Sequence, residues 1–245
     1  MAAVAPQIVD PETTSVLLTS AVKYDSKSTV KSADTLKSEI TTAITNYNTD
    51  TLQKFDAIYR HSKLTGIIDD TDTSILSNIT TIKIRKNFTP TLASSTKYDI
   101  YFRNALFNPH SGHMASTGGI LSSTGFKVTG SDYEMFFDDD GAGNVRRYYL
   151  ASGIRTYANE TQGTIDYSTG QITLNSLDVA SVSNIRGATS IVIELTVTPS
   201  SNDVVPVRDQ IVEIDIANST IAAVADTFVG GSADAGVGYT TTSSY

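Results

Sequence analysis

The stretch that decides the first part of the fold is Thr14-Ser-Val-Leu-Leu-Thr-Ser-Ala-Val-Lys-Tyr24. Apolar residues recur on one side of it with a period of two, at Val16, Leu18, Val22 and Tyr24. The alternate positions include the polar residues Thr19 and Lys23. This alternation is typical of a half-buried β-strand. The stretch therefore predicts a strand that places one face against a core.

The period changes to three or four residues beyond this strand. Ser28 is a candidate N-cap, because a serine side chain can accept a hydrogen bond from a first-turn amide. One apolar stripe then runs through Val30, Ala33, Leu36, Ile40, Ala43, Ile44 and Tyr47. This spacing predicts an amphipathic helix of about five turns. The polar residues 46–50 are expected to end it.

Two shorter helices and a second strand are expected next. The first helix would carry Leu52, Phe55, Ile58 and Tyr59 on its apolar side, and the second would span Ser62–Ile68. After the turn at residues 69–72, the isoleucines 79, 82 and 84 alternate with Thr81, Lys83 and Arg85. This pattern predicts a half-buried strand that ends near Phe88, before Pro90 closes the unit.

Residues 14–88 thus predict a β-α-α-β unit. Its two strands are expected to lie side by side in one sheet, with the helices covering one face of that sheet. After Pro90 the chain carries short strand patterns at 97–106, 126–129, 133–137, 145–150, 163–167, 171–174, 191–198 and 210–216. Residues 138–144 and 168–170 have the composition of hairpin loops. The expected fold class is α+β, with the N-terminal β-α-α-β unit followed by a mostly antiparallel β domain.

Changes in composition suggest four segments. These are an N-terminal arm at 1–13, the β-α-α-β domain at 14–90, a β-rich domain at 91–229 and a tail at 230–245. The tail consists mainly of glycine, alanine, serine and threonine. Because it offers little apolar surface to bury, we expect it to be flexible or to await a partner.

Composition limits the classes of function. The 245 residues include no cysteine and carry a formal charge of −8. The missing cysteine excludes disulfides, thiolate metal sites and a cysteine nucleophile. The acidic balance argues against nucleic-acid binding, which needs clustered lysine and arginine. No apolar run approaches the roughly 20 residues that span a bilayer, so we expect no membrane partner.

The three histidines, His61, His110 and His113, are the first candidate site residues. His110 and His113 share the loop at 108–119, and their spacing could hold a metal ion if a third ligand came from elsewhere. The nearby sequence offers no third histidine or cysteine and no helical HExxH pattern. We therefore expect solvated or locally hydrogen-bonded histidines, with no metal and no cofactor.

Acidic and basic clusters are the remaining candidates. Asp138-Asp-Asp-Gly-Ala-Gly-Asn144 resembles part of a calcium loop but lacks its spacing and closing glutamate, so a hairpin turn is favoured. Asp69, Asp70 and Asp72 could form a carboxylate pair, although acids in such a loop are usually solvated or cap helices. Arg146-Arg147 and Tyr148-Tyr149 are interpreted as surface contact residues. No nucleophile elbow is present. We assign no catalytic residue and predict that the chain is not an enzyme.

Three segments resemble a known family: Pro11-Glu-Thr-Thr-Ser-Val-Leu-Leu18, residues 55–70 and residues 80–90. The chain resembles the baseplate wedge subunit of T-even-type contractile-tailed phages, the gene six product family, which is related to baseplate J-like proteins. The resemblance covers residues 8–105 well and the later β region more loosely. Since the chain is far shorter than the phage protein, we expect it to hold the C-terminal portion.

This resemblance implies a structural protein of the virion tail baseplate, assembled in the host cytoplasm. Members of the family form homodimers, join wedges around the tail hub and contact other wedge and hub proteins. They rearrange when the baseplate changes state at infection. An alternative from another class is a receptor- or carbohydrate-binding β domain of a tail fibre or adhesin. Tyr148, Tyr149 and Tyr157 could supply its aromatic platform, although the chain has no tryptophan.

Overall fold

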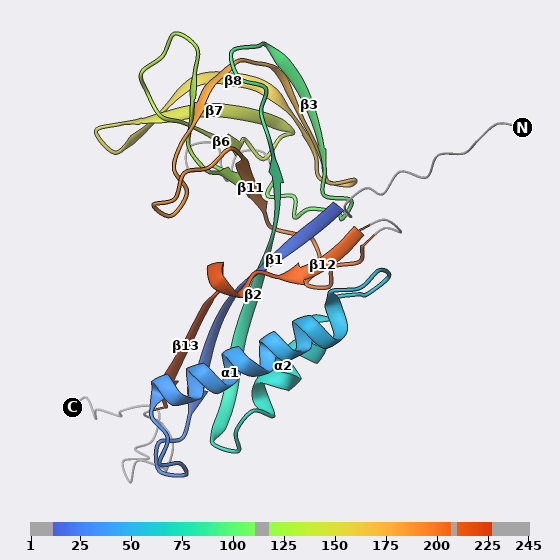
Figure 1. The fold of residues 1–245 in the computed structure, drawn as a ribbon, viewed down its shortest axis with the longest axis vertical. Coiled ribbons are helices and arrows are strands. Elements are labelled where there is room, and N and C mark those ends of the chain that lie inside the picture. The colour runs from blue at the N-terminus through green and yellow to red at the C-terminus, as the bar shows by residue number, and fades with distance from the viewer. Residues whose placement is uncertain (1–11, 111–117, 207–209, 227–245) are drawn as a thin grey trace, which may run out of the picture.

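A computed structural model describes residues 12–110, 118–206 and 210–226 (Figure 1). Two long strands, β1 (Glu12–Tyr24) and β2 (Ile75–Phe88), pair antiparallel, with Val16 opposite Ile84 and Leu18 opposite Ile82. The predicted inward face of β1 is buried. The expectation that both flanking strands share one sheet is therefore confirmed.

Helices α1 (Ala33–Tyr47) and α2 (His61–Asp69) cover one face of these strands (Figure 1). The predicted stripe of α1 is buried at Leu36, Ile40, Ile44 and Tyr47. The predicted start was wrong, because the hydroxyl of Ser32, not Ser28, accepts the hydrogen bond from the Thr35 amide. Val30 consequently lies outside the helix and is fully exposed.

The helix expected around Leu52–Tyr59 is absent from this described part of the chain. Residues Asn48–Leu52 form a single π-helical turn, η1, and Phe55 beyond it is 58% exposed. The Asn48 side chain donates to the Ile214 carbonyl and accepts from the Ile214 amide, which anchors the helix end to a distant strand. Tyr59 then pairs in extended conformation with Val204. These tertiary contacts override the local helical pattern.

Four strands from beyond Pro90 complete the first sheet. They are β4 (Ser122–Ser123), β11 (Ile193–Val197), β12 (Gln210–Ile214) and β13 (Thr220–Ala225). The order is β12-β1-β2-β11-β4, and β13 also pairs with β1. β12 and β13 run parallel to β1 and are separated by the 3₁₀ turn η2 (Ile216–Asn218). The sheet is therefore mixed and draws on residues from both sides of Pro90.

The second sheet has seven antiparallel strands in the order β10-β5-β6-β7-β8-β9-β3. Its members are β3 (Thr96–Tyr101), β5 (Phe126–Val128), β6 (Met135–Asp139), β7 (Asn144–Ala151), β8 (Ile154–Asp166), β9 (Gln171–Leu177) and β10 (Val179–Val182). The hairpin turns predicted after β6 and β8 are both present. β8 begins earlier than expected because Ser152 and Gly153 adopt positive φ, as a tight two-residue hairpin turn requires.

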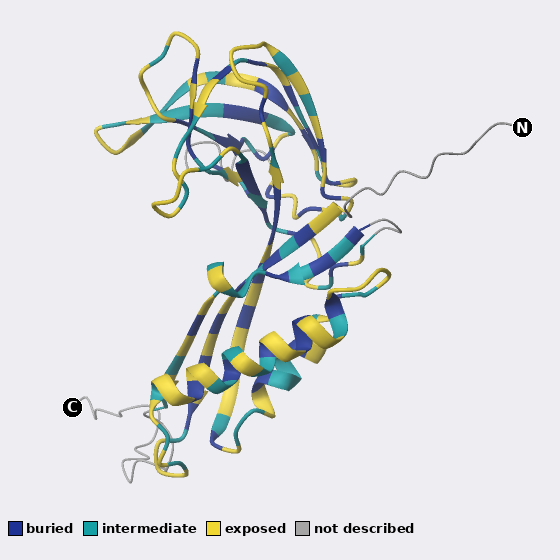
Figure 2. Ribbon diagram, viewed as in Figure 1, coloured by how far each residue is buried: buried dark blue, intermediate teal, exposed yellow. Residues whose placement is uncertain are grey.

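The described residues thus form a mostly β protein with two curled sheets and two α-helices. The β-α-α-β unit is present, but the α+β label fits the chain only loosely. A single apolar core runs through both sheets, and buried residues alternate with exposed ones along most strands (Figure 2). In this part of the chain, neither helix has the length and apolar character needed to cross a bilayer.

Two positions of β2 differ from the predicted pattern. Ile79 is 69% exposed. It lies three positions before the buried Ile82, and an odd offset along a strand places a side chain on the opposite face. Arg85, expected on the solvent side, is buried. The strand continues past the helices toward the second sheet, so its outward face becomes interior at that end (Figure 1).

Candidate functional site

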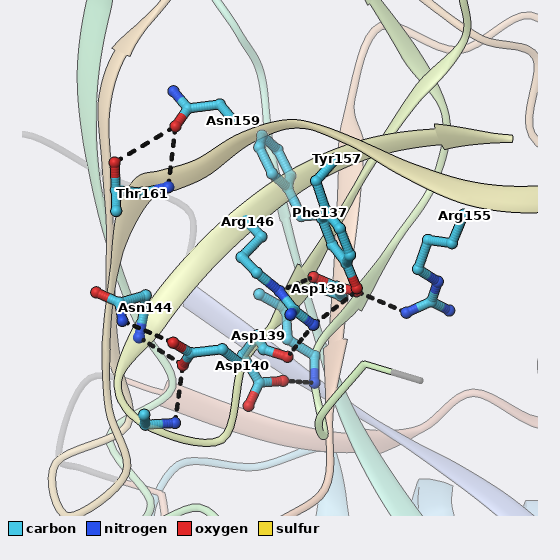
Figure 3. Close-up of polar contacts among 12 residues, drawn as sticks. Phe137, Asp138, Asp139, Asp140, Asn144, Arg146, Arg155, Tyr157, Asn159 and Thr161 are labelled. Carbon is cyan, nitrogen blue, oxygen red and sulfur yellow. Dashed lines mark hydrogen bonds and ion pairs between the residues drawn. The ribbon is translucent and has the colours of Figure 1, made fainter. Parts of the chain in front are cut away.

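The acidic run Asp138–Asp140 lies in the β6–β7 hairpin, where most of the candidate polar residues converge (Figure 3). The hairpin prediction is confirmed, but the strands extend further than expected. Asp138 and Asp139 belong to β6 and are only 1% and 0% exposed. Only Asp140 lies in the turn itself. Two of the three acids are therefore buried groups that require partners.

Asp140 closes the turn by accepting hydrogen bonds. Its Oδ1 accepts from the amides of Ala142 and Asn144, at 2.8 and 3.0 Å, and its Oδ2 accepts from the Asn144 side chain at 2.6 Å. Burial alone would raise the pKa of Asp140, but these hydrogen bonds lower it below its ordinary value. Gly141 and Gly143 both adopt positive φ, which explains the glycines in this segment.

Asp138 is the centre of a buried ion cluster. It accepts from Arg146 Nε at 2.9 Å and Nη2 at 3.2 Å, from Arg155 Nη1 at 2.6 Å and from the Tyr157 hydroxyl at 3.0 Å (Figure 3). The guanidinium of Arg146 lies over the Tyr157 ring at 4.2 Å, and that of Arg155 lies over the Tyr148 ring at 4.3 Å. Burial, and then the adjacent Asp138 carboxylate, raises the pKa of Tyr157. The Asp138 carboxylate thus accepts from two arginines and one tyrosine, and each arginine also lies over a tyrosine ring.

Asp139 fastens a neighbouring segment to the sheet. Its Oδ1 accepts from the Leu121 amide at 2.8 Å, its Oδ2 accepts from the Tyr167 hydroxyl at 2.6 Å, and its backbone carbonyl accepts from the Gly119 amide. A Cβ atom at Gly119 would lie 2.1 Å from this carboxylate, so only glycine permits the close approach. Burial, and then the contact with Asp139, raises the pKa of Tyr167.

The basic-aromatic run differs from its predicted surface role. Arg146 is buried in the Asp138 cluster, because it lies directly opposite Asp138 in the β6–β7 pair. Arg147, on the opposite face, is half-buried; its Nε has no hydrogen-bond partner, and burial lowers its pKa. Tyr149 stacks on Tyr133 at 4.3 Å. Tyr148 is half-buried between the Arg155 guanidinium and the Phe136 ring. The tyrosines therefore do not form one exposed platform.

Asp69, Asp70 and Asp72 have separate partners and do not converge. Asp69 accepts from the Asn78 side chain at 2.7 Å, and Asp70 is the C-cap residue of α2. Asp72 accepts from the Ser74 amide and hydroxyl and pairs with Lys31 Nζ at 2.6 Å. The hydrogen bonds from Lys31 and Ser74 lower the pKa of Asp72 to about 2. An acid–base pair is not assembled here.

The histidines are also dispersed. The His61 amide, at the start of α2, donates to Asp203 at 2.9 Å, and its ring nitrogen lies 3.4 Å from the Tyr59 hydroxyl. Burial lowers the pKa of His61. His110 is exposed, and its amide donates to Asn108. His113 lies outside the described residues. Within those residues, no group of three or more histidine or acidic side chains is placed to hold a metal ion.

A second buried ion network links β2 with β11 and with the residue that follows β12. Arg85 contacts the Asp215 carboxylate and lies 3.6 Å from Glu194, which in turn pairs with Arg186 at 2.8 Å. Asp215 directly follows β12, and Glu194 belongs to β11. Sequence reasoning missed this network, because both carboxylate partners of Arg85 lie more than 100 residues from it and no local pattern predicts such pairs.

Both clusters bind side chains of the same protein to one another. Their carboxylates accept hydrogen bonds and form ion pairs with side chains of the chain itself, so the arrangement stabilises the sheets. A family model described as baseplate structural protein gp6, C-terminal domain III, matches residues 14–87. The comparison with curated proteins gives no match. The matched residues run from β1 through both helices to the end of β2.

Proposed function

From the match of residues 14–87 to the model of gp6 C-terminal domain III, we propose that the chain is a wedge subunit of a contractile phage tail baseplate. It acts by assembly and not by catalysis. The subunit associates with itself, joins neighbouring wedges around the hub and takes part in the rearrangement of the baseplate at infection. The observation that carries this proposal is the coincidence of the family match with one folded β-α-α-β unit.

An exposed apolar surface on the β7–β8 hairpin supports self-association. Tyr133 is 57% exposed and stacks on Tyr149, and Ile154 at the hairpin tip is 70% exposed. Ile154 pairs with Ala151, two residues from Tyr149, so both side chains point to the same face. We call Tyr133, Tyr149 and Ile154 the hairpin patch. Exposed apolar patches of this kind mark interaction sites.

Charges beside the hairpin patch suit a twofold contact. Arg147 lies on the same strand face as Tyr149 and makes no ion pair with the described residues. Asp132, next to Tyr133, is exposed. A twofold axis through the patch lets Arg147 of one copy approach Asp132 of the other, which fixes the register of the contact. The homodimer is expected to bury more than about 1,000 Å² in total.

Light scattering at micromolar concentration tests this proposal. The unmodified protein should have twice the mass of one chain, and Ile154→Asp should shift it to the monomer, because a carboxylate would be buried in the contact. Ile79→Asp is the matched control, since Ile79 is equally exposed but lies on the first sheet. A monomeric mass for the unmodified protein would contradict the proposed dimer. Equal loss of the dimer in both variants would contradict the assignment to the hairpin patch.

A further inference from the structure

Among the described residues, none covers the lower half of the first sheet on the face opposite the helices (Figure 1). Here β13, β1 and β2 lie side by side, with Ala21 of β1 paired to both Ala222 and Ile79. The side chains on this face alternate with those packed against α1 and α2. We call it the lysine face, formed by Thr19, Ala21, Lys23, Ser77, Ile79, Thr81, Lys83, Thr220, Ala222 and Val224.

Apolar groups occupy the middle of the lysine face. Ile79 is 69% exposed and Val224 is 58% exposed, and the two alanines lie between them. Threonine methyl groups add to this surface. A sheet that faces only water usually carries polar residues at such positions. Large exposed aliphatic side chains in the middle of three paired strands indicate a surface that another molecule covers.

The charges on this face have one sign. Lys23 and Lys83 are both exposed, and neither makes an ion pair with the described residues. The lysine face contains no acidic residue, although the chain as a whole carries a formal charge of −8. Asp25 and Asp226 lie beyond one end of it, after the ends of β1 and β13. Glu213 and Asp215 lie beyond its other end, where Glu213 accepts from the Ser15 hydroxyl and Asp215 pairs with Arg85. The lysines lie on neighbouring strands, about 20 Å apart along the strand direction.

From these features we propose that the lysine face docks an acidic, partly apolar surface of a different protein. This rests on the proposed assembly function and names the chemistry of one partner. A carboxylate near each end of the partner surface meets Lys23 and Lys83, and aliphatic groups between them cover Ile79 and Val224. Electrostatic complementarity of this kind selects the partner and fixes its register.

A second copy of the chain fits this face poorly. Any twofold contact that pairs the lysine face with itself brings lysine toward lysine, because the face offers no acid to complement them. This contrasts with the hairpin patch, which has a charge of each sign. The chain's own residues 227–245 contain a single acid, Asp234, which cannot serve two lysines about 20 Å apart.

The size of the face also indicates how the partner lies. Three strands of about 4.8 Å width and seven residues of about 3.3 Å length give roughly 330 Å². A standard interface buries about 800 Å² on each partner. The partner therefore extends past the lysine face. It is expected to contact the adjoining edge of β13, because β13 pairs only with β1 among the described strands.

Site-specific cross-linking in assembled virions tests the proposal directly. A photoreactive amino acid replaces Ile79 in one variant and Val30, which is fully exposed beside the helices, in the control. Light should join the Ile79 variant to a different virion protein, through a peptide rich in aspartate or glutamate. A cross-link to another copy of this chain, to residues 227–245 of the same chain, or to nothing would overturn it. Absence of the chain from virions would instead refute the proposed function.

Charge reversal gives the second readout. The double variant Lys23→Glu/Lys83→Glu should lower incorporation of the chain into baseplates by about tenfold, since two attractions become repulsions. Lys37→Glu/Lys54→Glu makes the same change of charge on exposed residues of the helical side and should leave incorporation unchanged. Unchanged melting temperatures establish that both variants fold. Equal incorporation of the two double variants would contradict the role of the lysine face.

Discussion

Replacement of Asp138 by alanine tests the buried ion cluster most severely. The substitution removes four hydrogen bonds and leaves the guanidinium of Arg146, whose side chain is only 7% exposed, without its carboxylate. Breaking a buried ion pair by removing one partner costs about 3–5 kcal/mol. Arg155 adds little to this loss, because its side chain is 29% exposed and can turn toward water.

Contacts of Arg146 that survive the substitution place the expected loss at the lower end of that range. Arg146 Nη2 also donates to the Asp139 carbonyl at 3.0 Å, and this hydrogen bond survives the substitution. We expect a loss of about 3 kcal/mol in the free energy of unfolding. In a protein of this size that corresponds to a fall in Tm of about 6–12 °C.

Urea denaturation followed by circular dichroism, together with a thermal melt, measures this effect. Asp99→Ala is the control, because Asp99 pairs with Lys97 and accepts from the Thr173 hydroxyl at the surface, so its loss should lower the free energy of unfolding much less than that of Asp138. The double variant Asp138→Leu/Arg146→Met should be more stable than Asp138→Ala, since it leaves no unpaired buried charge. A loss below about 1 kcal/mol for Asp138→Ala would refute the reasoning.

Four further predictions concern the packing, two glycine positions, the pH response and the metal content. Leu36→Ala, at a fully buried position of α1, should cost about 2–5 kcal/mol, whereas Val30→Ala should change stability by less than about 0.5 kcal/mol in the same melt. Gly163→Ala should destabilise by about 1–3 kcal/mol, because its Cβ would lie 1.9 Å from the Thr173 carbonyl oxygen, while Gly66→Ala in the open helix α2 should stabilise by up to about 1 kcal/mol. The pKa of Asp72 is lower in the folded protein, at about 2, than in the unfolded chain, so its contribution is complete above about pH 4 and is lost as the pH falls toward 2. Asp72→Asn should therefore flatten the fall of unfolding free energy between pH 4 and 2, and an unchanged slope would count against the pair with Lys31. Chelator should leave Tm unchanged, and one tightly held ion per chain that is lost on His110→Ala would contradict this.

Periodic patterns predicted the elements whose structure depends on local sequence. The alternation in β1 and the stripe of α1 gave the correct buried faces, because one face of each element packs against the core. The Asp140 turn followed from glycines that accept positive φ and an aspartate that accepts backbone hydrogen bonds. Such features are encoded within a few residues.

Features that depend on distant residues could not be predicted in this way. The helix expected after residue 52 was replaced by a turn held to Ile214, 166 residues from its partner Asn48. Charged residues are ordinarily exposed. Arg85 and Asp138 are buried because Arg85 pairs with Asp215, which follows β12, and Asp138 pairs with Arg146 on β7. The parallel pairing of β12 and β13 with β1 likewise has no signal in the local sequence.

The location of the chain in purified virions tests the central claim most directly. Electron cryomicroscopy of intact tails should place a two-sheet density of this fold in the baseplate, at the level of the ring around the hub, with neighbouring copies in contact. Antibody raised against the chain should label the same end of the tail. Density for this fold in the tail fibres, or its absence from the particle, would contradict the account.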